Sequence, residues 1–175
     1  MGNRGILHDE NRRIVRATRN SMWLICLLEF KGRRREPMRP GTYTELFFLD
    51  EAVALAAGHR PCGECRRRAY RGFIDAVNVG TGNPIGGAKD LDRKLKASRA
   101  APRSVASIAD LPDGTFVTLG DNDFRLIWAG ALRRWAPEGY SDSTPIDDRD
   151  ALVVTPALSV TALRNGYPVQ AHPSV

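Results

Sequence analysis

Two cysteines separated by two residues, Cys62 and Cys65, form the clearest chemical pattern in the sequence. This spacing lets both sulfurs face one point, as in zinc knuckles and in dithiol redox sites. Pro61 before the motif and Gly63 inside it favour a tight turn. Three arginines follow at 66–68, and neighbouring cations stabilise a thiolate, the form that a metal and a nucleophile both need. The pair therefore predicts a zinc or thiol site and supplies half of a tetrahedral zinc shell.

Two further residues can complete that shell. Cys26 lies in an apolar run at 22–30 that predicts a buried strand, where a free cysteine is most simply a small core residue. If this strand packs beside the C-x-x-C motif, Cys26 becomes the third ligand. His59 precedes Cys62 by three residues, and its ring either binds the metal or fills an aromatic slot. The sequence leaves both pairs of alternatives open.

The residues on either side of the C-x-x-C motif form a longer pattern. Over residues 45–73 the chain reads FF, then EA, then AAG and HRPCGECR. This segment resembles the second half of the zinc-binding N-terminal domain of the Ada-type DNA methylphosphotriester repair protein. The resemblance implies that Cys62 and Cys65 bind zinc in a module that faces DNA. The family's upstream C-x-x-x-C pair, which includes the methyl-accepting cysteine, has no counterpart here, since residues 31–35 read KGRRR, and methyl transfer is therefore not expected.

Positive charge is concentrated in the N-terminal part of the chain. The whole chain carries +6, residues 1–71 carry +7 and residues 72–175 carry −1, with arginine as the main cation. A guanidinium group matches phosphate oxygens and guanine edges well, so the segregation favours a nucleic-acid partner, most simply DNA. The alternative is ordinary solvated surface charge. The residues predicted to contact phosphates are Arg33, Arg34, Arg35, Arg66 and Arg67.

The remaining patterns predict an α+β protein. Asp50 is placed to cap a short helix at 51–57, and apolar spacings of three and four predict an amphipathic helix at 66–77. We expect a zinc-knuckle-like basic module at 1–77, a glycine-rich linker with a basic helical or disordered segment at 78–105, and a small β-rich domain at 106–175. Short strands between turn residues in the last part predict a small antiparallel β-barrel or half-barrel.

Several function classes are disfavoured. There is no apolar run of about 18 residues and no secretory leader, so we expect a cytoplasmic protein without a membrane partner. An odd number of cysteines favours metal or thiol chemistry over a disulfide framework. No complete catalytic constellation is present, and the carboxylates of Asp147, Asp148 and Asp150 fit a solvated loop. The sequence predicts a zinc- and nucleic-acid-binding protein, and the resemblance implies a link to DNA repair or modification. The alternatives are a thiol-based or nucleic-acid-modifying enzyme and an interaction protein with a purely structural knuckle.

Overall fold

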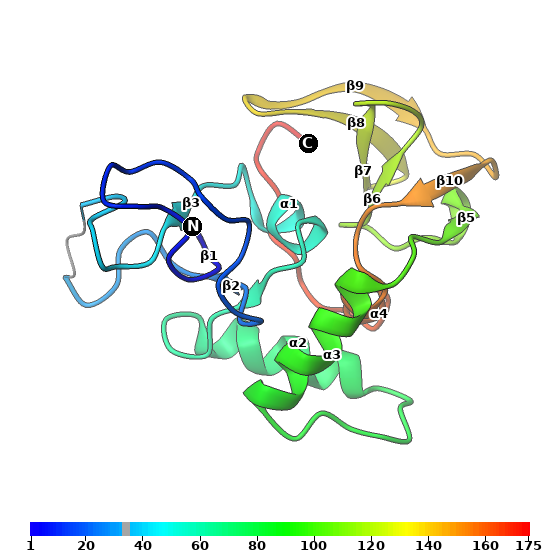
Figure 1. Cartoon of the computed structure of the whole chain (residues 1–175). Coiled ribbons are helices and arrows are strands. Elements are labelled where there is room, and N and C mark those ends of the chain that lie inside the picture. Colours follow the sequence, from blue (N-terminus) through cyan, green and yellow to red (C-terminus); the bar gives the residue numbers. More distant parts are fainter. Residues whose placement is uncertain (33–35) are drawn as a thin grey trace.

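The computed structural model describes residues 1–32 and 36–175 and shows an α+β protein with two sheets (Figure 1). The first sheet is mixed and has four short strands in the order β3-β1-β2-β4. Its strands are β1 (Gly2–Asn3), β2 (Leu24–Ile25), β3 (Glu45–Leu46) and β4 (Arg60–Pro61). β1 pairs antiparallel with β2 and β3, whereas β2 and β4 run parallel. Because β2 and β4 are parallel, the residues that follow them, Cys26 and Cys62, lie at the same edge of the sheet.

Three helices pack with Ile25 of the first sheet in one buried cluster. They are α1 (Glu51–Ala56), α2 (Arg67–Asn78) and α3 (Ala88–Ala100). The Asp50 carboxylate accepts a hydrogen bond of 2.8 Å from the Val53 amide, so the predicted cap of the first helix is confirmed. The basic segment is helical, as one of its two predicted alternatives had it. The helix is stabilised by packing, since Leu91 and Leu95 lie on one face of α3 and are fully buried.

The second sheet has six antiparallel strands in the order β5-β10-β6-β7-β8-β9. Its elements, with the short 3-10 helix η1 (Ile108–Asp110) after the first strand, are β5 (Val105–Ser107), β6 (Phe116–Thr118), β7 (Phe124–Trp128), β8 (Ala131–Ala136), β9 (Gly139–Pro145) and β10 (Asp150–Val153). β5 and β9 lie at opposite edges and do not pair with each other, so the sheet is not closed into a barrel, and the expectation of a closed barrel is corrected. The predicted antiparallel, β-rich character of this segment is confirmed. The longest strand, β9, was missed because its sequence, GYSDSTP, is polar and mostly exposed.

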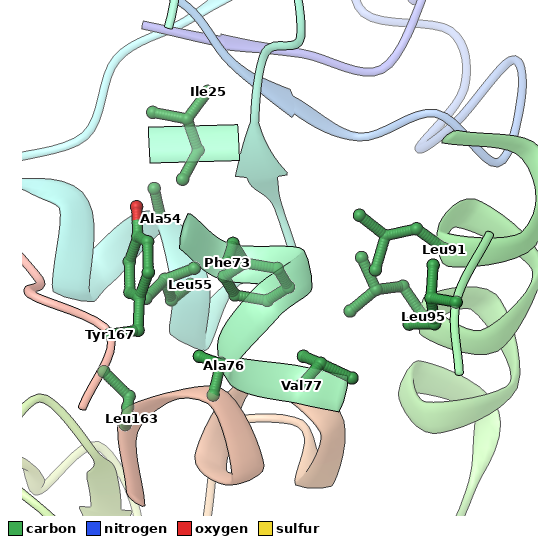
Figure 2. Packing of buried hydrophobic residues seen from close by; sticks show 12 residues of the cluster. Ile25, Ala54, Leu55, Phe73, Ala76, Val77, Leu91, Leu95, Leu163 and Tyr167 are labelled. Carbon is green, nitrogen blue, oxygen red and sulfur yellow. The ribbon is translucent and has the colours of Figure 1, made fainter. Parts of the chain in front are cut away.

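Helix α4 (Ala157–Arg164) and the C-terminal segment link the two sheets. Leu163 and Tyr167 lie in the buried cluster that includes Ile25 of β2 (Figure 2), whereas Val160 of α4 lies in a second cluster with Val117 and Ile127 of the second sheet. Phe73 of α2 meets the ring of Tyr167 edge to face, with the centroids 5.2 Å apart. Ala52 of α1 packs with Phe116 and Leu126 of the second sheet. The segments predicted as separate modules therefore contribute to common clusters.

The apolar run at 22–30 does not form the continuous buried strand that was expected. Only Leu24 and Ile25 are in a strand, while Leu27 and Leu28 are 44% and 70% exposed. The amide of Leu27 donates a hydrogen bond of 3.4 Å to the sulfur of Cys65 in place of a strand partner. The chain leaves the sheet at the point where it reaches the cysteines. In the described part of the chain, no helix is long and apolar enough to cross a membrane.

Candidate metal centre

Three cysteine sulfurs converge at the ends of β2 and β4. The Sγ atoms of Cys26, Cys62 and Cys65 lie within 4.8 Å of one another. Ile25 is paired with Pro61 in the parallel register, so the next residues, Cys26 and Cys62, leave the sheet side by side. The turn after Cys62 then brings Cys65 to the same point, with the Arg66 amide donating to the Cys62 carbonyl at 3.1 Å.

The donor set fits a thiophilic metal ion such as zinc. With zinc–sulfur bonds of about 2.3 Å in a tetrahedron, the sulfurs lie about 3.8 Å apart, so the cluster needs only a small contraction. A cavity of about 40 Å³ opens beside the three sulfurs, and its other walls come from Met1, Leu27, Leu28, Phe30 and Glu64. The cluster can therefore hold a metal ion with three thiolate ligands, which leaves one tetrahedral position to another donor.

The electrostatics of the cluster favour a thiolate at Cys62. A hydrogen bond from the Cys26 thiol, aided by hydrogen bonds from the backbone of Cys65 and Glu64, lowers the pKa of Cys62 to about 5 although burial opposes this. The same contact with Cys62, together with burial, raises the pKa of Cys26. Burial is the main cause that raises the pKa of Cys65. A thiolate held by N–H···S contacts is an arrangement suited to a metal ligand.

His59 lies outside the group of sulfurs. Its ring is fully buried between Phe48 and Trp23, with centroid distances of 4.8 and 5.4 Å. Nε2 accepts a hydrogen bond of 3.2 Å from Nε of Arg4. Burial, and then the Arg4 charge, lowers the pKa of His59 to about 3, so the ring is neutral at physiological pH. This is the aromatic-slot position that the sequence left as one of two alternatives.

The arginines predicted to contact nucleic acid have different surroundings. The side chain of Arg66 is 11% exposed and pairs with buried Glu51 at 2.9 Å. Glu51 also accepts hydrogen bonds from the Tyr167 hydroxyl at 2.7 Å and the Gln170 amide at 3.2 Å. Arg66 thus joins α2 to α1 and to the C-terminal segment, a role that sequence spacing did not signal.

Arg67 is exposed on the first turn of α2. With Arg68 it lines a hollow of about 540 Å³ that reaches Cys65. Arg33, Arg34 and Arg35 lie outside the described residues. Two of the predicted arginines are therefore placed, and one of these two faces solvent.

A comparison of the chain with models of known protein families, with curated proteins and with solved structures finds no match. The convergence of three cysteine sulfurs is the most specific feature of the site.

Proposed function

We propose that the chain binds one zinc ion through Cys26, Cys62 and Cys65 and that this metal-stabilised module binds nucleic acid. The observation that supports the metal is the approach of three sulfurs to within 4.8 Å, brought about by residues 36 positions apart at the ends of paired strands. Three thiolates of this kind bind zinc in preference to magnesium or calcium, which select oxygen ligands.

The proposed nucleic-acid contact begins next to the metal. Arg67 and Arg68 line the hollow that reaches Cys65, and the chain carries a net charge of +6. The resemblance of residues 45–73 to the zinc domain of the Ada-type repair protein supports DNA as the partner and a role in DNA repair or modification. Because the upstream cysteine pair is replaced by KGRRR, the proposed activity is binding and not methyl transfer.

Metal analysis of the purified chain, combined with thiol titration, tests the zinc site. We expect one zinc per chain and three thiols protected from modification until a chelator is added. The C65S variant should lose the metal, whereas C65H should keep it, because an imidazole nitrogen replaces a thiolate in many zinc sites. A metal-free chain whose thiols cycle readily between dithiol and disulfide would instead support a redox enzyme.

Binding to labelled duplex DNA across a salt series tests the second part. Each phosphate contact contributes about 0.9 to the slope of log affinity against log salt, so R67A/R68A should flatten the slope by about 2. Absence of binding to DNA or RNA at low salt would reject the nucleic-acid part and leave the metal site as a structural or interaction element.

A further inference from the structure

A second cationic region lies at the opposite ends of the same two strands. Trp23 directly precedes β2, and two guanidinium groups lie over its ring, with Arg4 Cζ 3.8 Å and Arg99 Cζ 4.2 Å from the centroid. The indole N–H donates to the Thr18 hydroxyl at 2.9 Å and to the Asn20 carbonyl at 3.0 Å. With its ring against two cations and its N–H bonded, Trp23 positions arginines and is not free to stack on a base.

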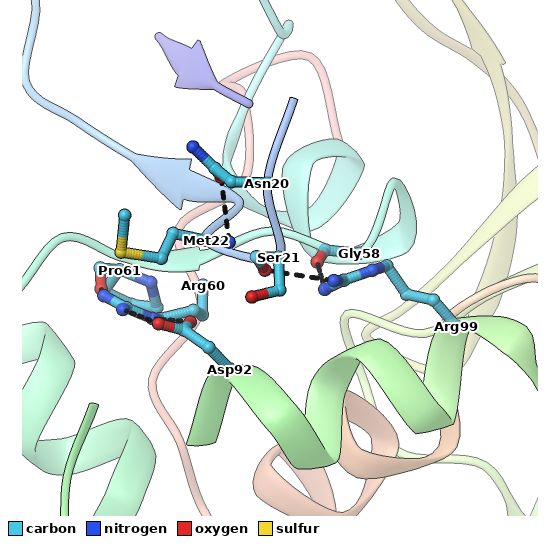
Figure 3. A network of polar contacts seen from close by, with 8 residues as sticks. All are labelled: Asn20, Ser21, Met22, Gly58, Arg60, Pro61, Asp92 and Arg99. Carbon is cyan, nitrogen blue, oxygen red and sulfur yellow. Dashed lines mark hydrogen bonds and ion pairs between the residues drawn. The ribbon is translucent and has the colours of Figure 1, made fainter. Parts of the chain in front are cut away.

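Arg99 is held in a fixed position between segments distant in sequence (Figure 3). Its two terminal nitrogens donate to the Gly58 carbonyl at 2.9 Å and to the Ser21 carbonyl at 3.1 Å. Gly58 has a φ of 82°, and a Cβ at this position would lie 2.4 Å from Cδ of Arg99, so only glycine admits this approach. α3 thereby places a cation on the loop that precedes β4.

The charge of Arg99 is poorly compensated. Burial is the main cause that lowers the pKa of Arg99. The charge of Asp92 opposes this effect, and the charge of Arg4 adds a smaller lowering. Asp92, however, is occupied by Arg60, with two hydrogen bonds of 2.9 and 2.8 Å (Figure 3). A nearby anion would therefore be stabilised by Arg99.

Two hollows adjoin at Trp23 and Arg99, which line both of them. One has a volume of about 250 Å³ and includes Arg103, and the other has a volume of about 460 Å³ and includes Arg19 and Lys96. No carboxylate lines either hollow. The side chains of Arg19, Lys96 and Arg103 are exposed, and none of them forms an ion pair within residues 1–32 and 36–175. The positive potential of this surface is thus not cancelled locally.

We propose that these two hollows bind the sugar–phosphate backbone of a nucleic-acid strand, with phosphates at Arg19, Lys96 and Arg103 on either side of the fixed Arg99. This inference rests on the nucleic-acid part of the proposed function and assigns it a surface distinct from Arg67 and Arg68. A polyanion fits better than a single phosphate because the cations are distributed over two adjoining hollows. Because phosphate contacts carry no sequence information, binding here is expected to be independent of sequence.

The test is fluorescence anisotropy with the full chain and labelled oligonucleotides of two unrelated sequences, single-stranded and duplex, across a salt series. The R19A/K96A/R103A variant keeps Arg99, which is tied to the backbone. For this variant, the slope of log affinity against log salt on duplex DNA should flatten by about 2 to 3, because each lost phosphate contact contributes about 0.9. Both sequences should be affected equally. The matched control R134A/R149A/R164A removes the same charge from exposed arginines outside the two hollows and should leave the slope nearly unchanged.

Each outcome is decisive once thermal melts show that both variants are folded. Equal flattening in variant and control would mean that only total charge matters and would overturn the proposed surface. An unchanged slope in the variant, with flattening in R67A/R68A, would overturn this surface while the proposed function stands. No binding by the parent chain would overturn both this inference and the nucleic-acid part of the proposed function, whereas zinc content measured on the same sample would still test the metal site.

Discussion

At the scale of single residues, the parallel strands β2 and β4 place the thiols at one end and the buried imidazole of His59 at the other. Their carboxyl ends gather the thiols of Cys26 and Cys62, and their amino ends bring Trp23 beside His59. The sulfurs are partly accessible through a small cavity, whereas the imidazole is fully buried among aromatic rings. Burial thus makes His59 a neutral core residue while leaving the thiols available to a metal ion.

The neutral His59 makes stability depend on pH. Its pKa is about 3 when folded and 6.5 in an unfolded chain, so the unfolded state binds a proton first as the pH falls. Stability is therefore lost as the pH decreases below about 6.5. From about pH 7.5 to about pH 5 this residue should lower the free energy of unfolding by about 2 kcal/mol. In H59F the free energy of unfolding should fall by about 2 kcal/mol less than in the parent over this pH range, as measured by denaturant titration. An identical pH dependence in both proteins would contradict a neutral, buried His59.

At the scale of elements, α3 is attached to the first sheet by buried charge. Arg60 of β4 and Asp92 of α3 form a two-bond ion pair, and their side chains are 4% and 5% exposed. The ring of Tyr70 lies 5.2 Å from the guanidinium carbon of Arg60. This contact fixes α3 against the strand that leads into Cys62 and also orients the helix that carries Arg99.

Removing one partner of this pair should be costly. D92A leaves a buried guanidinium without its anion, and we expect a loss of about 3 to 5 kcal/mol in the free energy of unfolding. The apolar double variant R60M/D92L should recover most of that loss, because no buried charge remains unpaired. D90A on the same helix removes the pairs of the half-buried Asp90 with Arg93 and Lys94 at the protein surface, and it should change stability by less than about 1 kcal/mol. Denaturant unfolding measures all three, and a small effect of D92A would show that Arg60 is solvated.

At the scale of the whole molecule, the C-terminal segment joins the two sheets. Asp50, the cap of α1, accepts hydrogen bonds from the Tyr140 hydroxyl of β9 at 2.7 Å and from the His172 amide at 3.0 Å. Tyr167 fills the core beside Phe73 and donates to Glu51. These contacts favour cooperative unfolding of the two sheets.

The Y167A variant tests this cooperativity. Loss of a buried aromatic side chain should lower the free energy of unfolding by about 3 to 5 kcal/mol. Because α4 and the C-terminal segment beside Tyr167 pack on α2 and also on the second sheet, hydrogen exchange should increase both in α2 and in β6 and β7. V105A is the control: this side chain is 62% exposed, so its removal should change neither the free energy of unfolding nor the hydrogen exchange of these elements. Exchange that increases in α2 alone would show that the β-rich part is an independent unit, as the sequence division at 106–175 predicts.

The sequence determined the features that depend on local spacing. The C-x-x-C turn, the Asp50 cap and the spacing of apolar residues in α2 are all set by neighbours within a few positions, and the sequence alone predicted them correctly. Whether Cys26 or His59 joins Cys62 depended on the register and direction of two strands far apart in the chain, which no local pattern encodes. Only the tertiary structure decided that parallel pairing brings Cys26 to the sulfurs and keeps His59 in the core. The same holds for Arg66, whose buried partner Glu51 lies on another helix, and for the open second sheet, whose edges depend on strand order and not on strand sequence.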